Sequence, residues 1–408
     1  MSQLIVPRTF TQTGTEKVAG RKIGIVEPAN GPDSRMRRIV GNPKSSLPCV
    51  LVFETGGTVC QKPNKQGQLE PSNTCVTPLV AGIEDVATLF VETLPTLIDS
   101  TKMKTEQRAM IAQTIYNYEM FPPVVDINGT KVQLNFVGYV VPHGTDTMTD
   151  SAIYITYALT NFGKPIVFTG SQITIFRPDT DGKKNLYRAV QVATLNVGEV
   201  VIAFGDNLIR GSRAVKFDEE AANAFLSPRR AALGNLGIFA QLNPYVVPRQ
   251  EIFMPTLFSD FAEGFELITP PSGERTNQFR HLLMDNDKIG GVAVGYGAGN
   301  IDGDLYGDDI RALQDAHKPL IVVTQSSQGR ADMTVYGAGA AAIDNRIIPG
   351  RDMTAASAMQ KLKYAVGLAM NQGIEKPDLI EFVRRVIGTV FNDDISLPRD
   401  AGAYRARE

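Results

Sequence analysis

The sequence predicts an α/β fold with an open, mostly parallel sheet, helices on both faces of the sheet, and a smaller C-terminal α/β domain. Two observations support this prediction. Short, uniformly apolar runs recur along the chain, each followed by a loop rich in Gly, Ser, Thr, Asp or Asn. Such runs are typical of strands that are buried on both faces. Segments with helical spacing of apolar residues fill the gaps between them.

The predicted elements alternate along the chain, which favours parallel pairing of the strands. The predicted strands lie within residues 49–58, 132–147, 165–172, 199–207, 290–300 and 319–329. Two predicted helices follow strands, at residues 148–161 and 185–196. A third helix is predicted near the C-terminus, where the apolar residues are Leu379, Phe382, Val383, Val386, Ile387 and Val390.

Composition shifts suggest the domain boundaries. Prolines cluster between residues 245 and 278 and interrupt the alternation, which predicts a linker at 251–278 between domains at 48–250 and 279–408. Residues 1–47 form a basic N-terminal extension, with eight Lys or Arg residues against three acidic ones. We expect a partly ordered arm or an oligomer contact there. A small domain that touches RNA is the second interpretation.

The overall composition is that of an average globular protein, with 43% hydrophobic and 21% charged residues among 408. The formal net charge is -2, so we expect neither nucleic acid nor an anionic membrane as a partner. No apolar run approaches the roughly 18 residues of a membrane span, and we see no secretory signal. The three cysteines (Cys49, Cys60, Cys75) form neither a disulfide framework nor a zinc pattern. We therefore expect a cytoplasmic protein.

Two strand ends carry chemically useful loops. Thr55-Gly56-Gly57-Thr58 combines a glycine turn, which can expose backbone N–H groups, with a hydroxyl on each side. His143-Gly144-Thr145-Asp146-Thr147 adds a carboxylate to a similar turn. Each loop alone could be a tight turn that caps a helix. Together they suggest amide hydrolysis, which needs a nucleophile, a base and N–H donors for the oxyanion.

The residue types and their spacing do not identify the general base that accepts the proton of the nucleophile. The chain has only three histidines and no G-x-S-x-G motif, so a Ser-His-Asp site is weakly supported. A lysine that is desolvated near a hydroxyl can also accept a proton. Lys216 follows a predicted strand and could reach the same sheet edge, although spacing alone favours a solvated surface amine.

Several motifs in family-like order resemble the bacterial-type L-asparaginases, and most closely their cytosolic, type I branch. The likeness runs from about residue 48 to about residue 391. The motifs are TGGT at 55–58, VVPHGTDTMTDSA at 140–152, KPIVFTGSQI at 164–173, NLYRAV at 185–190, RGSRAVK at 210–216, GAGN at 297–300 and QSSQGRADMTVYGAG at 325–339.

The resemblance implies a threonine amidohydrolase that cleaves the side-chain amide of asparagine, or a related small amide, through an acyl-enzyme. By the match to TGGT, Thr58 would be the nucleophile. By the match to HGTDT, Thr145 and Asp146 would join Lys216 in a proton relay. Backbone N–H groups near Gly57 and Thr145 would stabilise the oxyanion.

The resemblance also implies a substrate-binding set and an oligomer. Ser100 matches the position that binds the α-carboxylate of the substrate in the family, and Asp146 is a candidate to pair with the α-amino group of the substrate. The GAGN segment that contains Asn300 resembles a loop that reaches across a tight dimer interface in the family, so a homodimer or homotetramer is expected. The substrate-binding set is Gly57, Ser100, Thr101, Gly144 and Asn300. No metal or organic cofactor is implied.

The loop after TGGT departs from the family pattern. The family carries a tyrosine ten residues after the nucleophile, where this chain has Gln68, which forms hydrogen bonds but cannot ionise like a phenol. Thr58 would then be activated in another way, the activity would be low, or the substrate would be a different amide. Lys102 stands where the family commonly has an acidic residue, which favours a bulkier or more anionic amide.

Two rival functions remain open. The archaeal tRNA-dependent amidotransferase subunit shares the asparaginase-like core and adds an N-terminal domain, which suits the extension at residues 1–47. A low-activity homologue is the other alternative, because Gln68 replaces the tyrosine. A nucleotide-binding site at Gly337–Ala342 is disfavoured, because no acidic residue ends a second strand about twenty positions further on.

Overall fold

The computed structural model describes residues 8–18, 20–28, 35–67, 69–71, 77–80, 82–332 and 347–396. The chain divides into two compact units. The first unit comprises residues 1–227 and 231–259, and the second comprises residues 228–230 and 260–408. The loose glycine motif at residues 337–342 and the loop residue Gln68 lie outside the described residues.

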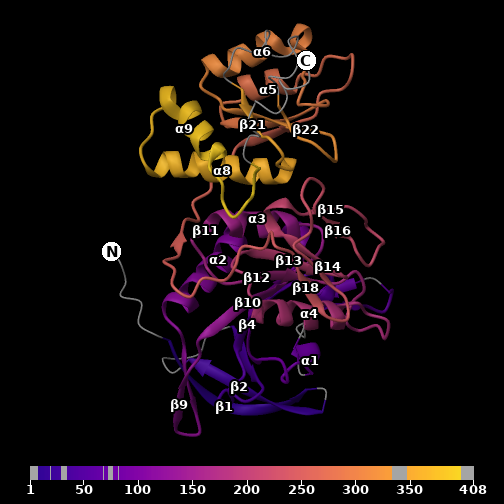
Figure 1. Ribbon diagram of the computed structural model, residues 1–408, viewed down its shortest axis with the longest axis vertical. Coiled ribbons are helices and arrows are strands. Elements are labelled where there is room, and N and C mark those ends of the chain that lie inside the picture. The colour runs from indigo at the N-terminus through magenta and orange to yellow at the C-terminus, as the bar shows by residue number, and fades with distance from the viewer. Residues whose placement is uncertain are drawn as a thin grey trace. The chain divides into compact units, whose positions relative to one another are not determined.

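The centre of the first unit is a parallel sheet (Figure 1). Its strands pair in the order β13–β12–β10–β4–β7, and every pairing among them is parallel. The apolar runs predict β4, β10, β12 and β13 correctly, because their residues are buried almost throughout, whereas β7 was not predicted. The bounds are β4 (Cys49–Gly56), β7 (Thr88–Ile98), β10 (Phe136–Pro142), β12 (Ile166–Thr169) and β13 (Val200–Phe204).

Strands that pair antiparallel, apart from the parallel pair β1–β8, extend this sheet at both ends, so that 13 strands form one sheet within the described residues. Beyond β13 lie β14 (Asn207–Arg210), β17 (Gly234–Leu236) and β18 (Ala240–Leu242). Beyond β7 lie β3 (Met36–Val40), β2 (Arg21–Pro28), β1 (Thr9–Val18), β8 (Val124–Ile127) and β9 (Thr130–Gln133).

The described part of the N-terminal extension forms strands rather than an arm. Its described residues form β1, β2 and β3, and β3 pairs antiparallel with β7. A buried ion-pair network secures this junction, because Glu92 on β7 accepts from Arg35, Arg37 and the phenol of Tyr118. The alternating polar residues of β1 suit a strand with one covered face, and the oligomer contact stays a prediction.

Helices cover both faces of the central strands (Figure 1). Helix α2 (Thr105–Met120) and helix α3 (Met148–Ala158) pack together on one face. Helix α4 (Gly182–Thr194) packs on the other face with the short α1 (Thr77–Val80). The remaining short strands pair as β5 (Gln61–Pro63) with β6 (Leu69–Pro71), β11 (Leu159–Thr160) with β19 (Thr256–Leu257), and β15 (Val215–Lys216) with β16 (Phe225–Leu226).

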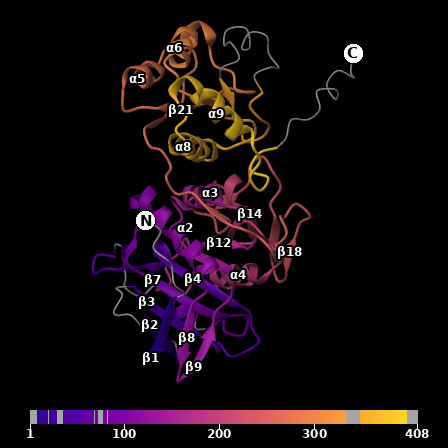
Figure 2. The same cartoon turned by 90° about the vertical axis from the view of Figure 1, so that its left-hand side faces the viewer.

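The second unit has its own parallel sheet, in the order β20–β21–β22–β23, between two helix layers (Figure 2). Alternate residues of β21 face opposite layers, as the two-residue period of a strand requires. Val292 packs with the α8 and α9 side, whereas Ala293 packs with the α5 and α6 side. The bounds are β20 (Phe265–Ile268), β21 (Gly290–Gly295), β22 (Leu320–Thr324), β23 (Ile348–Pro349), α5 (Gln278–Met284), α6 (Gly303–Asp315), α8 (Ala355–Asn371) and α9 (Lys376–Gly388).

Two cationic side chains anchor the second unit. Arg229 belongs to it within the short segment 228–230, which is flanked on both sides by residues of the first unit, and it donates to the carbonyl oxygens of Thr324, Ser326 and Met353. Lys361 on α8 donates to Asp394 Oδ2 at 2.6 Å and to the carbonyl oxygen of Thr389. Side chains 361 and 394 are both fully buried.

The predicted fold class is confirmed, since each unit has a parallel core between helix layers and the second unit is the smaller one. No helix in the described part of the chain is long and apolar enough to cross a membrane. The cysteine expectation was wrong at one position: Cys60 is disulfide-bonded, while Cys49 is free. Cys75 lies outside the described residues. The cysteines therefore no longer support a reducing compartment.

Candidate active site

The two threonine-bearing turns lie against each other. They follow β4 and β10, which are adjacent parallel strands, so both turns leave the sheet at the same edge. Gly57 has a φ of 88°, and a Cβ atom built on it would lie only 2.2 Å from the Cα of Gly144. A Cβ on Gly144 would in turn lie 2.4 Å from Ser100 Oγ. Only glycine permits this close approach of three chain segments.

Hydrogen bonds hold the three segments in register. The Thr55 hydroxyl donates to the carbonyl oxygen of Pro142 at 2.8 Å, which ties the end of β4 to the end of β10. The Thr147 hydroxyl donates to the carbonyl oxygen of Ser100 at 2.7 Å. These bonds are buried or partly buried, so each adds stability and fixes the turn geometry.

Lys216 reaches the second turn from β15 and contacts both neighbouring side chains. Its Nζ lies 3.1 Å from Thr145 Oγ1 and 3.0 Å from Asp146 Oδ1. The lysine side chain is 13% exposed and the Thr145 residue is buried, whereas Asp146 is 50% exposed. The interpretation of Lys216 as a solvated surface amine was therefore wrong.

A third oxygen completes the surroundings of this amine. Glu219 Oε2 lies 2.5 Å from Lys216 Nζ. Burial lowers the pKa of Lys216, but hydrogen bonds and charge from Glu219 and Asp146 outweigh it, so the pKa is raised above its ordinary value. Sequence reasoning missed Glu219, and the only available signal was its spacing of three residues from Lys216.

His143 is an anchor for the second turn. Its Nδ1 lies 2.8 Å from the Gly144 carbonyl oxygen, which can only accept, so Nδ1 carries the proton and Nε2 is the acceptor. The Ser151 hydroxyl then donates to Nε2, and Arg108 Nε donates to Ser151. Burial lowers the pKa of His143 to about 4. The ring is therefore neutral at pH 7 and holds the turn rather than exchanging protons.

The other predicted site residues are placed as follows. Thr58 begins the 3₁₀ turn η1 (Thr58–Cys60) directly after Gly57, and its side chain is outside what the structure describes. Ser100 is buried, whereas Thr101 is exposed and donates its N–H and hydroxyl to Asp99. Asn300 belongs to the second unit, where its backbone bridges to Tyr296. Its role at the site stays a prediction.

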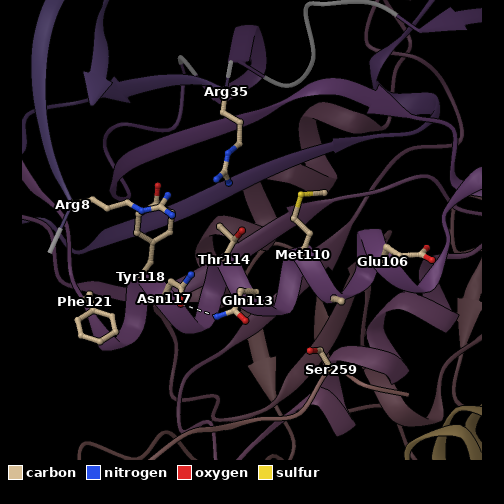
Figure 3. A pocket seen from close by; sticks show the side chains of 11 residues that line it. Arg8, Arg35, Glu106, Met110, Gln113, Thr114, Asn117, Tyr118, Phe121 and Ser259 are labelled. Atoms are coloured by element: carbon tan, nitrogen blue, oxygen red, sulfur yellow. Dashed lines mark hydrogen bonds between the residues drawn. The ribbon is translucent and has the colours of Figure 1, made fainter. Parts of the chain in front are cut away.

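One cavity in the described part of the chain lies elsewhere, along α2 (Figure 3). Its volume is about 400 Å³, and its walls include Arg8 and Arg35, which directly precede β1 and β3, and Gln113 and Asn117 from α2. None of the three side chains around the Lys216 amine lines it. We place the candidate site at the two turns, because there a hydroxyl, an amine and two carboxylates meet within hydrogen-bond distance.

Both units match known family models. Residues 49–245 match the "Asparaginase, N-terminal" model, and residues 272–374 match the "Glutaminase/Asparaginase C-terminal domain" model. The chain belongs to the asparaginase family. It is an L-asparaginase-like amidohydrolase, as its motifs predict.

Individual relatives agree with this assignment. L-asparaginase 1 of Escherichia coli is 28% identical over 77% of this chain and 90% of that protein. The structure of L-asparaginase I from Vibrio cholerae superposes with a TM-score of 0.72 at 25% identity, covering 86% of this chain and all of that one. The chain matches only 49% of the length of an L-asparaginase from Dirofilaria immitis, at 29% identity over 74% of this chain.

A second kind of relative covers more of the chain. A glutamyl-tRNA(Gln) amidotransferase subunit of Pyrococcus abyssi is 25% identical over 92% of this chain and 83% of that protein. This match includes at least part of the regions that the two asparaginase family models leave out.

Proposed function

We propose that this protein hydrolyses the side-chain amide of asparagine, or of a related small amide, to a carboxylate and ammonia. The observation that carries the proposal is the contact of Lys216 Nζ with Thr145 and Asp146, at 3.1 and 3.0 Å. That contact lies on the turn that packs against Gly57, the residue before the proposed nucleophile. The names of the asparaginase relatives support the substrate class.

The proposed reaction begins with Thr58. Its hydroxyl oxygen attacks the amide carbon, and its proton passes to the departing nitrogen, which leaves as ammonia. Water then attacks the acyl-enzyme while Thr145 accepts a proton from it and passes its own to Lys216. The Lys216 proton returns to Thr58 as the acyl bond breaks, so both residues regain their starting state. Backbone N–H groups near Gly57 and Thr145 stabilise each oxyanion.

The proposed substrate contacts surround this relay. Ser100 holds the α-carboxylate with Thr101 beside it, and Asp146 pairs with the α-amino group. The burial of Ser100 beneath Gly144 supports a fixed position for its hydroxyl. Asn300 would complete the site from a second copy of the chain, so we propose a homodimer or homotetramer. The cytoplasmic location stays a prediction, as does the absence of a metal or organic cofactor.

The test is ammonia release from the purified chain. Asparagine, glutamine, N-substituted amides and D-isomers should be compared at equal concentration. Thr58→Ala should abolish turnover if Thr58 is the nucleophile, and Thr194→Ala on α4, outside the proposed site, serves as a matched loss of a hydroxyl. Unchanged turnover in Thr58→Ala would refute the proposed nucleophile. Preference for plain asparagine by a wide margin would refute the idea that Gln68 and Lys102 redirect the specificity.

One observation favours a second candidate, the amidase subunit of a tRNA-dependent amidotransferase. The match to the Pyrococcus abyssi protein extends over 92% of the chain, against 77% for the Escherichia coli asparaginase. The two candidates differ in what they require. A free-standing hydrolase releases ammonia without tRNA or a partner protein, whereas an amidotransferase subunit should be slow alone and accelerate when both are added.

A further inference from the structure

We infer that Glu219 is a positioning residue of the relay, whose carboxylate fixes the orientation of the Lys216 amine toward Thr145. This inference rests on the proposed function, because it concerns how the relay lysine accepts a proton. Glu219 lies in none of the motifs that identify the family, and it is separated from Thr145 by 74 positions of the sequence.

The argument starts from the number of partners around the amine. Three oxygens lie within hydrogen-bond distance of Lys216 Nζ, at 2.5 Å for Glu219, 3.0 Å for Asp146 and 3.1 Å for Thr145. A protonated lysine has three N–H donors, so all three contacts are then satisfied. A neutral lysine has two N–H donors and one lone pair. Carboxylates can only accept, so they take the two N–H groups and the lone pair is left for the Thr145 hydroxyl.

This arrangement defines the proton transfer. The O–H bond of Thr145 breaks as the N–H bond of Lys216 forms, and Thr145 oxygen takes a proton from the attacking water in the same step. Without Glu219, one N–H of the neutral amine would lack a carboxylate acceptor within the site. The amine could then rotate and turn its lone pair away from Thr145.

The Glu219 side chain is exposed to solvent, but hydrogen bonds fix the loop that carries it. Lys216 pairs with Phe225 across β15 and β16, and the Phe217 N–H donates to the carbonyl oxygen of Ala224. The Asp218 carboxylate accepts from the N–H groups of Glu220 and Ala221. These bonds close the loop at both ends around Glu219.

A second anchor comes from another strand end of the sheet. Gln172 Nε2 donates to the backbone carbonyl of Glu219 at 2.6 Å. The residue is thus held by its backbone while its side chain, 77% exposed, points to the amine. This hydrogen bond restricts the backbone at Glu219, which a glutamate on a freely solvated loop would lack.

The charges around the amine determine the expected pH dependence. The ionisable groups in contact with Lys216 are the carboxylates of Asp146 and Glu219, and both favour the ammonium form. The Asp218 carboxylate is occupied by backbone N–H groups, and Arg213 on the preceding turn η3 (Gly211–Arg213) is buried. Removing the charge of Glu219 should therefore lower the pH at which the amine becomes neutral.

The experiment is a pH profile of ammonia release for wild type, Glu219→Gln, Glu219→Ala and the neighbouring control Glu220→Gln. Glutamine keeps an acceptor oxygen but loses the charge. We expect its rising limb in kcat to move to lower pH by about half a unit to one unit, since the pair is close but exposed to solvent. Its plateau kcat should stay within about twofold of wild type, because orientation is retained.

Alanine removes both the charge and the acceptor. Glu219→Ala should show the same shift of the limb and a plateau kcat about tenfold lower, with kcat/KM unchanged, because orientation is lost in the step that hydrolyses the acyl-enzyme. Glu220→Gln should match wild type. The inference is overturned if both Glu219 variants superimpose on wild type, or if alanine and glutamine lower kcat equally.

A direct titration separates this inference from the proposed function. In protein with ¹³Cε-labelled lysine, the Lys216 resonance can be assigned by its absence in Lys216→Met. Its pKa should fall in Glu219→Gln and stay constant in Glu220→Gln. If wild type releases no ammonia while this shift appears, the proposed function fails and the pairing of Glu219 with Lys216 stands. If the resonance titrates identically in all proteins, the inference fails whatever the activity.

Discussion

Two lysines of this chain have similar carboxylate partners and different surroundings. Lys361 in the second unit is fully buried, and its amine is held by Asp394, a backbone carbonyl and the ring of Phe391. Lys216 in the first unit faces a hydroxyl and two exposed carboxylates. A dry, fully satisfied ion pair stabilises one conformation, whereas an amine between a hydroxyl and solvent can exchange a proton. The surroundings of the amine therefore distinguish a structural lysine, which stabilises the fold, from a chemical lysine, which can exchange a proton.

The largest effect should come from the chemical lysine. Lys216→Met should lower kcat by about 10³-fold, because the relay loses its proton acceptor. The free energy of unfolding should change little, since Asp146 and Glu219 are 50% and 77% exposed and stay hydrated. Ammonia release and urea unfolding measure the two quantities. A large loss of stability in this variant would contradict the comparison.

The structural lysine should behave in the opposite way. Lys361→Met should lower the free energy of unfolding by about 3–5 kcal/mol, because the buried Asp394 is left without its cation. Adding Asp394→Leu should recover part of this loss by removing the uncompensated charge. Urea unfolding of the single and double variants measures both effects. Equal stability of Lys361→Met and wild type would refute the structural role.

Protonation of His143 should give a smaller effect. Burial lowers its pKa from 6.5 to about 4 in the folded state. The unfolded chain therefore takes up this proton first as the pH falls from 6.5, and stability is lost down to about pH 4. The loss is up to about 3 kcal/mol.

His143→Gln is the matched variant for this prediction, because glutamine keeps hydrogen bonding and does not titrate in this range. The difference in unfolding free energy between wild type and variant should shrink as the pH falls from 6.5 to 4. A difference that stays constant over that window would show that His143 does not remain neutral in the folded protein.

The smallest effect should come from a neutral hydroxyl at the same site. Thr55→Val removes the hydrogen bond to the Pro142 carbonyl and keeps the shape of the side chain. We expect a loss of about 1 kcal/mol in unfolding free energy and less than about a threefold change in kcat. An activity loss as large as that of Lys216→Met would mean that Thr55 acts in the reaction itself.

Local sequence patterns could predict part of the parallel core of each unit, but not β7, β20 or β23. Uniform burial leaves a clear apolar run, as in β4 and β22, and helical spacing marks α9. The strands of the N-terminal extension carry no such run, because β1 exposes every second residue. Its place beside β7 depends on Glu92, which lies more than fifty positions along the chain from Arg35 and Arg37.

The candidate site was predictable only where motifs exist. The two turns and Lys216 belong to motifs of the asparaginase family, so the chain could be placed in it from the sequence. Glu219 and Ser151 lie only three and eight positions from their partners Lys216 and His143, but their local sequence does not mark them, and Arg108 contacts Ser151 across 43 positions. A buried serine or an exposed glutamate carries no local pattern that distinguishes it from others of its kind.

The position of Arg229 has a practical consequence for dissecting the protein. A gene fragment that starts at residue 260 would encode almost all of the second unit, yet it would omit the guanidinium that bridges the carbonyls of Thr324, Ser326 and Met353. Such a fragment would have to reorganise the chain around β22 before it could be used in isolation. Swapping C-terminal units between homologues would need to exchange residues 228–230 as well.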